Sequence, residues 1–228
     1  RVIARACHEA IDTYCVAYRD RYVSMAERIQ PDVTNWRQVW SRAAFAILSA
    51  NARFESAVAA LQYGNRHRGR CNRGELAKLA MIPAKTDWLN ALPCGDRILQ
   101  FCRGRDETYH DQRLRLRKTV LGLGLTKASF LTALLDPVNA DVACIDTHMQ
   151  RLVMARPAWR PIGLRDYLDA EAVVRGIAHD HEVSTFLAQW LVWDHGRGTV
   201  TDHDIFPGRH KGRLTTLSGR SSRASKAT

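Results

Sequence analysis

Two short stretches of the sequence combine residue types that could carry chemistry. The first, LGLGL, has Gly122 and Gly124 one residue apart, and a strongly basic segment comes before it. Glycine lets a backbone approach a ligand closely, and a helix that starts after such a turn directs free N–H groups at an anion. The second stretch, VACIDTH, places Asp146 after an apolar run. A partly buried carboxylate of this kind can stabilise a developing positive charge or activate a nucleophile.

Asp146 also has a purely structural interpretation. An aspartate ahead of THMQRL is a favourable helix N-cap, because its side chain accepts a hydrogen bond from an N–H group of the first turn. The two roles are compatible, since a cap fixes where the carboxylate points. A G-x-G turn is by itself a weak signal and is often only a tight turn. The functional interpretation therefore depends on the turn, the basic segment and Asp146 occurring together.

The elements that must position these groups are predicted to be helices. Ala, Leu, Arg and Glu are frequent, apolar residues recur at spacings of three and four, and no alternating run of strand length stands out. We expect a helix from Trp36 that is capped by Thr34 or Asn35. It should end near Asn51, and a second helix should begin near Phe54.

Shorter helices and a basic turn region follow in the predicted order. A basic, glycine-bearing loop is expected at 63–74, and short helices are expected at 75–81, 86–90 and 96–102. The strongly basic segment 109–120 has helical composition, and Thr126 is a suitable cap for the helix after the glycine turn. The sequence therefore predicts an all-α protein.

Composition and charge narrow the class of protein. The chain has 228 residues, 46% of them hydrophobic, which is enough for one substantial core or two small lobes. Lys and Arg outnumber Asp and Glu by 34 to 23, and the pI is about 9.8, which favours a polyanionic partner, either nucleic acid or an anionic membrane surface. No apolar run approaches the length of a membrane span, and no signal peptide is visible. We therefore expect no membrane-spanning segment, and a protein of the cytoplasm or nucleoid, or of the host-cell cytoplasm if it is viral.

The cysteines and histidines do not predict a metal site. Cys7, Cys15, Cys71, Cys94, Cys102 and Cys144 form no C-x-x-C pair, so we expect free thiols in a reducing compartment. His179 and His181 are two residues apart and so face different directions on a helix. The wider set that we considered as ligands is His179, His181, His195, His203 and His210, with Asp202 and Asp204.

Four stretches resemble the helix-hairpin-helix DNA glycosylase superfamily, the group that contains endonuclease III and the 8-oxoguanine glycosylases. GLGLTKASF resembles its hairpin signature, and VACIDTHMQRL resembles the segment that carries its catalytic aspartate. FAILSANARFESAVAAL resembles an early core helix with the turn that enters the DNA gap, and FLAQWLVWDHGRG resembles the closing helix. The similarity extends over 36–198 and is greatest to the compact archaeal type of 8-oxoguanine glycosylase.

The resemblance implies an architecture. It is an all-α fold of two lobes with a DNA-facing cleft between them, in which the first helices pack with the C-terminal ones. The domain would cover residues 1–206. The composition of 207–228, with many basic and small residues and few apolar ones, separately predicts a basic, flexible tail. The implied partner is double-stranded DNA, bound by a monomer, and no membrane partner is expected. The resemblance implies no cofactor, except that the hairpin carbonyls would bind a monovalent cation.

The resemblance also implies roles for particular residues. Asp146 takes the place of the catalytic aspartate. Asn51 takes the place of a polar residue that fills the space left by the flipped base, although asparagine is also a common helix C-cap. Trp190 and Trp193 lie on one side of an apolar helix, where core packing competes with stacking on the flipped base. The residues expected to contact DNA are Asn51, Gly122, Leu123, Gly124, Thr126, Lys127, Arg113, Arg115 and Lys118.

One lysine is out of step with this family. Its bifunctional members have a Schiff-base lysine two residues after the second hairpin glycine, a position that Thr126 holds here, and Lys127 comes next. One helical step turns a side chain by about 100°, so Lys127 should contact a phosphate or lie in solvent. It would act as the nucleophile only if the hairpin were locally distorted. The resemblance thus implies a monofunctional glycosylase that flips a base, hydrolyses its N-glycosidic bond and leaves the DNA backbone intact, with AP lyase activity in doubt.

Two other functions stay open at this point. The same scaffold could serve a transferase that modifies a base already in DNA, as related phage-type hypermodification enzymes are thought to do. Such an enzyme would need a second substrate and another role for Asp146. Alternatively, the hairpin and the basic helix could form a non-catalytic DNA-binding module, in which the Asp146 carboxylate would have no chemical function.

Overall fold

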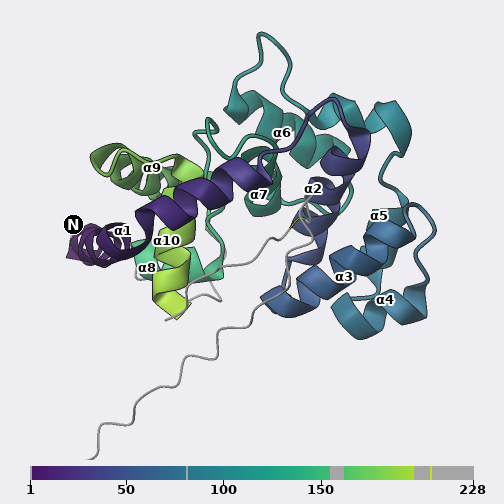
Figure 1. Ribbon diagram of the computed structural model, residues 1–228, viewed down its shortest axis with the longest axis horizontal. Helices are drawn as coiled ribbons and strands as arrows, with labels where there is room; N and C mark the ends of the chain where they lie inside the picture. Colours follow the sequence, from purple (N-terminus) through teal and green to yellow (C-terminus); the bar gives the residue numbers. More distant parts are fainter. Residues whose placement is uncertain (1, 81, 155–161, 198–205, 207–228) are drawn as a thin grey trace, which may run out of the picture.

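The computed structural model describes residues 2–80, 82–154, 162–197 and 206, and these ranges contain helices and no strand. The all-α prediction is therefore confirmed. The helices form two groups that meet near the centre of the molecule (Figure 1). A search of the described residues finds no helix that could span a membrane. The basic tail expected at 207–228 lies outside the described residues.

One group joins the beginning of the chain to its later helices. Its members are α1 (Val2–Ile29), α8 (Thr147–Met154), α9 (Leu164–Asp180) and α10 (Thr185–Arg197). α1 packs against α8 and α10, and Figure 1 shows it running across this group. Tyr22 of α1 donates a buried hydrogen bond to the Asp194 carboxylate of α10 at 2.5 Å. The first helix thus packs with the C-terminal helices, as expected.

The other group is built around one buried helix. Its members are α2 (Trp36–Leu48), α3 (Phe54–Arg66), α4 (Arg73–Ala80), α5 (Ala84–Asn90) and the 3₁₀ helix η1 (Gly95–Phe101). α2 is almost entirely buried and contacts α3, α5 and η1. Asn35 caps α2 by accepting the N–H of Arg37 at 3.1 Å, which confirms one of the two predicted caps. The short helices lie close to their predicted positions.

Two helices joined by the glycine hairpin connect the groups. α6 (Tyr109–Thr119) and α7 (Leu125–Leu135) pack on each other, and α7 also packs on α2. α7 is buried from Ala128 to Leu135, and its first turn, Leu125 to Lys127, is partly buried. Phe206 is buried against α2, where its ring lies 3.9 Å from the Arg42 guanidinium. Because α7 packs on α2, the hairpin at its start is attached to the core of the second group.

Candidate active site

A cavity of about 790 Å³ lies where the two groups of helices meet. Its walls come from the turn between α2 and α3, the start of α7, the segment before α8, and α10. Asn51, Thr126, Lys127 and Asp146 all line it. These residues are far apart in the sequence, and the fold brings them together as the resemblance implied.

Asp146 is held at the start of α8. It is partly buried, and its Oδ1 accepts a hydrogen bond from the N–H of Met149 at 2.9 Å. Its carbonyl accepts the N–H of Gln150 at 2.8 Å. The predicted N-cap and the predicted partial burial are both confirmed. The cap fixes the carboxylate at the edge of the cavity, while its catalytic role stays a prediction.

The segment just before Asp146 is not helical, yet it is buried, and its backbone needs hydrogen-bond partners. Three side chains from the neighbouring helices α9 and α10 accept its N–H groups. The pairs are Ala143 with Glu171 at 2.9 Å, Cys144 with Gln189 at 2.6 Å, and Ile145 with Tyr167 at 3.2 Å. The Tyr167 hydroxyl also donates to the Ala143 carbonyl at 2.7 Å. Helices from the C-terminal half therefore set the position of Asp146.

Sequence reasoning did not find these supporting residues. The available signal was weak: Tyr167, Glu171 and Gln189 are polar groups on helix faces that are otherwise apolar. Burial raises the pKa of Glu171, although the guanidinium of Arg113 opposes this change. A polar residue at a core position indicates a buried partner, but only the fold shows which backbone group that partner is.

Arg113 corrects one of the predicted DNA contacts. Its side chain is fully buried, and its Nη1 donates to Glu171 Oε1 at 2.6 Å and to Ser129 Oγ at 3.3 Å. The ion pair joins α6 to α9 inside the core. The prediction that Arg113 contacts DNA is therefore wrong, because its charge is neutralised within the protein.

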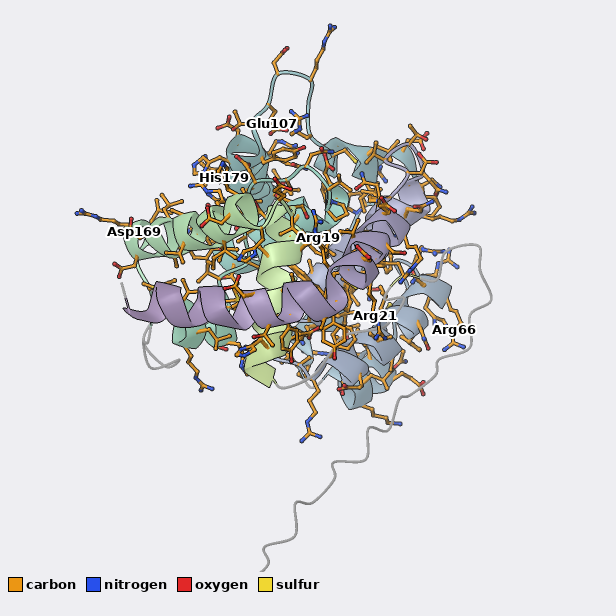
Figure 2. All side chains as sticks on the ribbon, turned by 60° about the vertical axis from the view of Figure 1, so that its left-hand side comes forward. Arg19, Arg21, Arg66, Glu107, Asp169 and His179 are labelled. Carbon is orange, nitrogen blue, oxygen red and sulfur yellow. The ribbon has the colours of Figure 1, made fainter. Side chains whose placement is uncertain are left out.

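Arg115 is also engaged by the protein rather than presented to a ligand. Its Nε donates to Glu107 Oε1 at 2.7 Å, and Glu107 is labelled in the loop at the top of Figure 2. The guanidinium donates further to the carbonyls of Gln100 and Cys102. A DNA contact of Arg115 stays a prediction. Lys118, in the last turn of α6, is exposed and stays a predicted phosphate contact.

The hairpin requires one of its glycines and leaves space around the other. Gly122 has φ 85°, and a Cβ atom there would lie 2.4 Å from the indole of Trp88. Gly124 is exposed, has extended φ and ψ, and has no atom within 4 Å of the place where a Cβ would be. Leu123 is buried, so only its backbone can face DNA. These features fit close approach of a phosphate to the start of α7.

Thr126 does not cap α7 as predicted. Gly124 is the N-cap and the helix begins at Leu125, which places Thr126 inside the first turn. Its hydroxyl donates to the Ile145 carbonyl at 3.4 Å and it lines the cavity. Thr126 therefore faces the segment that carries the carboxylate.

Lys127 lies in the cavity rather than in solvent. It is partly buried, its Nζ donates to Ser49 Oγ at 3.2 Å, and the ammonium lies 5.2 Å from the centroid of the Phe130 ring. The expectation that Lys127 lies in solvent is wrong, because its long side chain reaches Ser49 and lines the cavity. A contact between Lys127 and a DNA phosphate stays a prediction. An amine and the Asp146 carboxylate thus line one cavity.

A second lysine, Lys85, lies near Lys127 at the end of α2, and sequence reasoning missed it. Lys85 is fully buried and its Nζ donates to the Leu48 carbonyl at 2.9 Å, where a cation suits the C-terminal end of α2. Burial, with a smaller contribution from the charge of Lys127, lowers the pKa of Lys85 to about 8.

Ser49 is the C-cap of α2, so Asn51 does not end the helix as predicted. Asn51 is exposed with φ 49°, and it stays a candidate for the space left by a flipped base.

Aromatic side chains form much of the remaining cavity wall. Trp190 is buried and Trp193 is partly buried, with ring centroids 5.7 Å apart, and both line the cavity. Core packing and contact with a ligand are therefore both available to them. Cys144 also lines the cavity, but burial raises the pKa of its thiol to about 12. It therefore stays protonated near neutral pH and is a poor nucleophile.

The residues considered as metal ligands do not come together within the described ranges, where no group of three His, Cys, Asp or Glu side chains could hold a metal. The His179 side chain is 90% exposed on α9 (Figure 2), and His181 contacts Asp12 at 3.3 Å. His203, His210, Asp202 and Asp204 lie outside the described residues.

The remaining predictions on thiols and cations have different outcomes. Cys71, Cys94, Cys102 and Cys144 are free thiols, as expected, and the side chains of Cys7 and Cys15 lie outside the described set. The Val120 carbonyl in the hairpin accepts the N–H of Leu123 at 3.2 Å and keeps a second lone pair. Such oxygens fit a monovalent cation, whose binding stays a prediction.

Comparisons with known proteins identify the fold. No family model matches the sequence, and no curated protein matches it. The 8-oxoguanine DNA glycosylase of Thermotoga maritima superposes with a TM-score of 0.71 at 15% identity, over 86% of this chain and 99% of that one. The Methanocaldococcus jannaschii 8-oxoguanine glycosylase/lyase, in complex with a 15mer DNA containing 8-oxoguanine, gives 0.73 at 18% identity over 85% and 98%. The chain therefore has the all-helical fold of these glycosylases.

Proposed function

We propose that this chain is a DNA glycosylase, which flips a damaged or modified base into the cavity and breaks its N-glycosidic bond. The observation that carries the proposal is the meeting of Asp146, Asn51 and the first turn of α7 around one cavity on this fold. The excess of basic residues suits a DNA partner. A base in a duplex must leave the stack before its sugar can be reached, and the cavity gives it a place to go.

Asp146 serves as the catalytic carboxylate in this proposal. Breaking the bond between C1′ and the base leaves positive charge on the sugar, which a fixed carboxylate stabilises. In the hydrolytic reaction the oxygen of a water bonds to C1′, the base leaves with the electron pair of the broken bond, and the water gives up a proton to Asp146 or to the base. The phosphodiester backbone stays intact.

Hydrolysis is the main reaction that we propose, because Thr126 holds the position of the family's Schiff-base lysine. The substrate is double-stranded DNA, and the acting unit is a monomer in the cytoplasm or nucleoid.

A second candidate is a glycosylase with lyase activity, and the position of Lys127 favours it. Its ammonium group lies in the same cavity as Asp146. If it lost its proton, the amine could attack C1′, release the base and form an imine with the opened sugar, after which the 3′ phosphate would leave by elimination. The M. jannaschii protein is described as a glycosylase/lyase.

One experiment separates these reactions. The protein is incubated with duplexes that each carry one damaged or modified base, and released bases are identified by mass spectrometry. Strand breaks are scored before and after alkali, and borohydride is added to trap an imine. Hydrolysis predicts release, breaks only after alkali and no trapped complex. Lyase chemistry predicts breaks without alkali and a trapped complex that Lys127→Gln loses and Lys118→Gln keeps. No release from any duplex contradicts the glycosylase proposal.

A further inference from the structure

Two side chains that line the cavity and are almost fully buried each carry a polar atom with no hydrogen-bond partner within the described residues: the indole N–H of Trp190 and the amide Oε1 of Gln150. Both side chains line the cavity, and they are only 3% and 8% exposed. Similar atoms occur elsewhere in the described core, at Trp40 and Gln112, but those side chains do not line the cavity. Because a buried donor or acceptor is costly to leave unpaired, the pair in the cavity indicates a ligand.

Gln150 and Trp190 are held in a fixed relation to the carboxylate. Gln150 lies one helical turn after Asp146, the N-cap of α8, and its N–H donates to the Asp146 carbonyl at 2.8 Å. Trp190 follows Gln189 on α10, whose Oε1 accepts the N–H of Cys144 at 2.6 Å. The donor and the acceptor are thus tied to the segment that positions Asp146.

The surroundings of these two atoms suit a flat, uncharged molecule. The rings of Phe130 and Trp190 are nearly parallel with centroids 6.3 Å apart, and Phe54 meets Trp190 edge-on at 6.4 Å. Aromatic walls with a few fixed polar groups are typical of sites for planar ligands. The ammonium of Lys127, 5.2 Å from the centroid of Phe130, repels a cation in the same space.

We infer that Gln150 and Trp190 select the base: Gln150 Oε1 accepts a hydrogen bond from an N–H of the base, and the Trp190 indole donates to a carbonyl oxygen or ring nitrogen of the same base. The class of ligand is an uncharged base that keeps an N–H next to an acceptor. A base methylated at that nitrogen loses the donor, and a base made cationic by alkylation meets the charge of Lys127. The inference rests on the proposed glycosylase function and adds the class of base to it.

The test measures binding of small probes, so that it does not depend on catalysis. Equilibrium dialysis is carried out with 2′-deoxyinosine, 2′-deoxyuridine and 8-oxo-2′-deoxyguanosine, each paired with its ring-N-methylated form. The cavity variants are Gln150→Leu and Trp190→Phe. Gln112→Leu and Trp40→Phe are controls, since each removes a buried unpartnered atom outside the cavity. Gln112→Leu also removes the bond from its Nε2 to the Phe101 carbonyl, so Trp40→Phe is the closer match. The wild-type protein should bind at least one unmethylated probe about tenfold more tightly than its methylated form. The cavity variants should lose this preference, and the controls should keep it.

Each outcome has a distinct meaning. No preference in the wild-type protein overturns the inference, and this comparison needs no variant to fold. A preference that survives in both cavity variants also overturns it. A preference that depends on Gln150 and Trp190, with no base released from any duplex, supports the inference and contradicts the glycosylase reaction. Release that is unchanged in both cavity variants leaves the reaction standing and overturns the inference.

Discussion

Arg113 of α6 and Lys127 of α7 are cations on adjacent helices, and the fold gives them opposite environments. Arg113 is fully buried in an ion pair with Glu171, 2.6 Å away, whereas Lys127 reaches into the cavity that Asp146 also lines. On sequence grounds Arg113 was expected to contact DNA, and Lys127 was expected to contact a phosphate or to lie in solvent. The difference teaches that a basic run in the sequence is not a basic surface. Whether a basic side chain is buried or exposed depends on the face of the helix that carries it and on the partner that the tertiary structure supplies.

The largest expected effect is on stability and comes from replacing the buried Arg113. Arg113→Met should lower the free energy of unfolding by about 3–5 kcal/mol, because it leaves Glu171 buried without its partner. Arg117→Met, on the exposed face of the same helix, should change it by less than about 0.5 kcal/mol. Urea denaturation of both variants measures the difference. A stable Arg113→Met protein with weakened DNA binding would restore Arg113 as a DNA contact.

The hairpin between the two helices provides the next test. Gly122→Ala should cost about 2 kcal/mol, because alanine is strained at φ 85° and its Cβ would strike Trp88. Gly124→Ala is the matched control, since that position has extended backbone and open space around it. It should be nearly neutral for stability. Thermal or urea unfolding checks both, and equal losses at the two glycines would contradict the described hairpin geometry.

The buried lysine behind the cavity should give a pH-dependent stability. The pKa of Lys85 is about 8 in the folded protein and 10.5 as its ordinary value, so between these values the unfolded chain binds more protons. The free energy of unfolding should therefore rise with pH across this window, by about 1–2 kcal/mol relative to Lys85→Met. Exposed Lys78→Met should follow the wild-type protein. Urea denaturation at pH 8 and pH 10 measures the difference, and a wild-type advantage that shrinks as pH rises would contradict this account.

The smallest expected effect belongs to the exposed end of α6. Lys118→Ala should weaken DNA binding only a few-fold on any sequence and reduce the salt dependence of binding by about one counterion. Lys78→Ala, on α4, should leave both unchanged. Fluorescence anisotropy at several salt concentrations provides the measurement. An unchanged salt slope for Lys118→Ala would show that this end of α6 does not face DNA.

The sequence predicts the fold and the site to different depths. Helical periodicity, the Asn35 and Asp146 caps and the glycine turn are local features, and the structure confirms them. Arg113 could have been placed correctly, since it lies on the same face of its helix as buried Leu116 and Val120. The sequence interpretation relied on the basic composition of the segment instead of this periodicity, and so predicted that Arg113 contacts DNA.

Other parts of the site depend on residues distant in sequence. Glu171 and Gln189 hold the backbone before Asp146, and Lys85 lies under the end of α2, but no local pattern shows these partners. The direction of Lys127 depends on where α7 begins, and the N-cap is Gly124, two residues before the predicted Thr126. The positions of these site residues are therefore set by tertiary contacts, which the local motifs do not show.

The most direct test of the central claim is base release by Asp146→Asn. Asparagine is also a good N-cap, so α8 should stay intact and DNA binding should survive. Once the wild-type protein's substrate base has been identified, single-turnover release of that base from a duplex is measured for both proteins, with affinity for the duplex as the control. The account predicts a loss of at least about 100-fold in release with nearly unchanged affinity. Undiminished release would show that Asp146 is not the catalytic carboxylate.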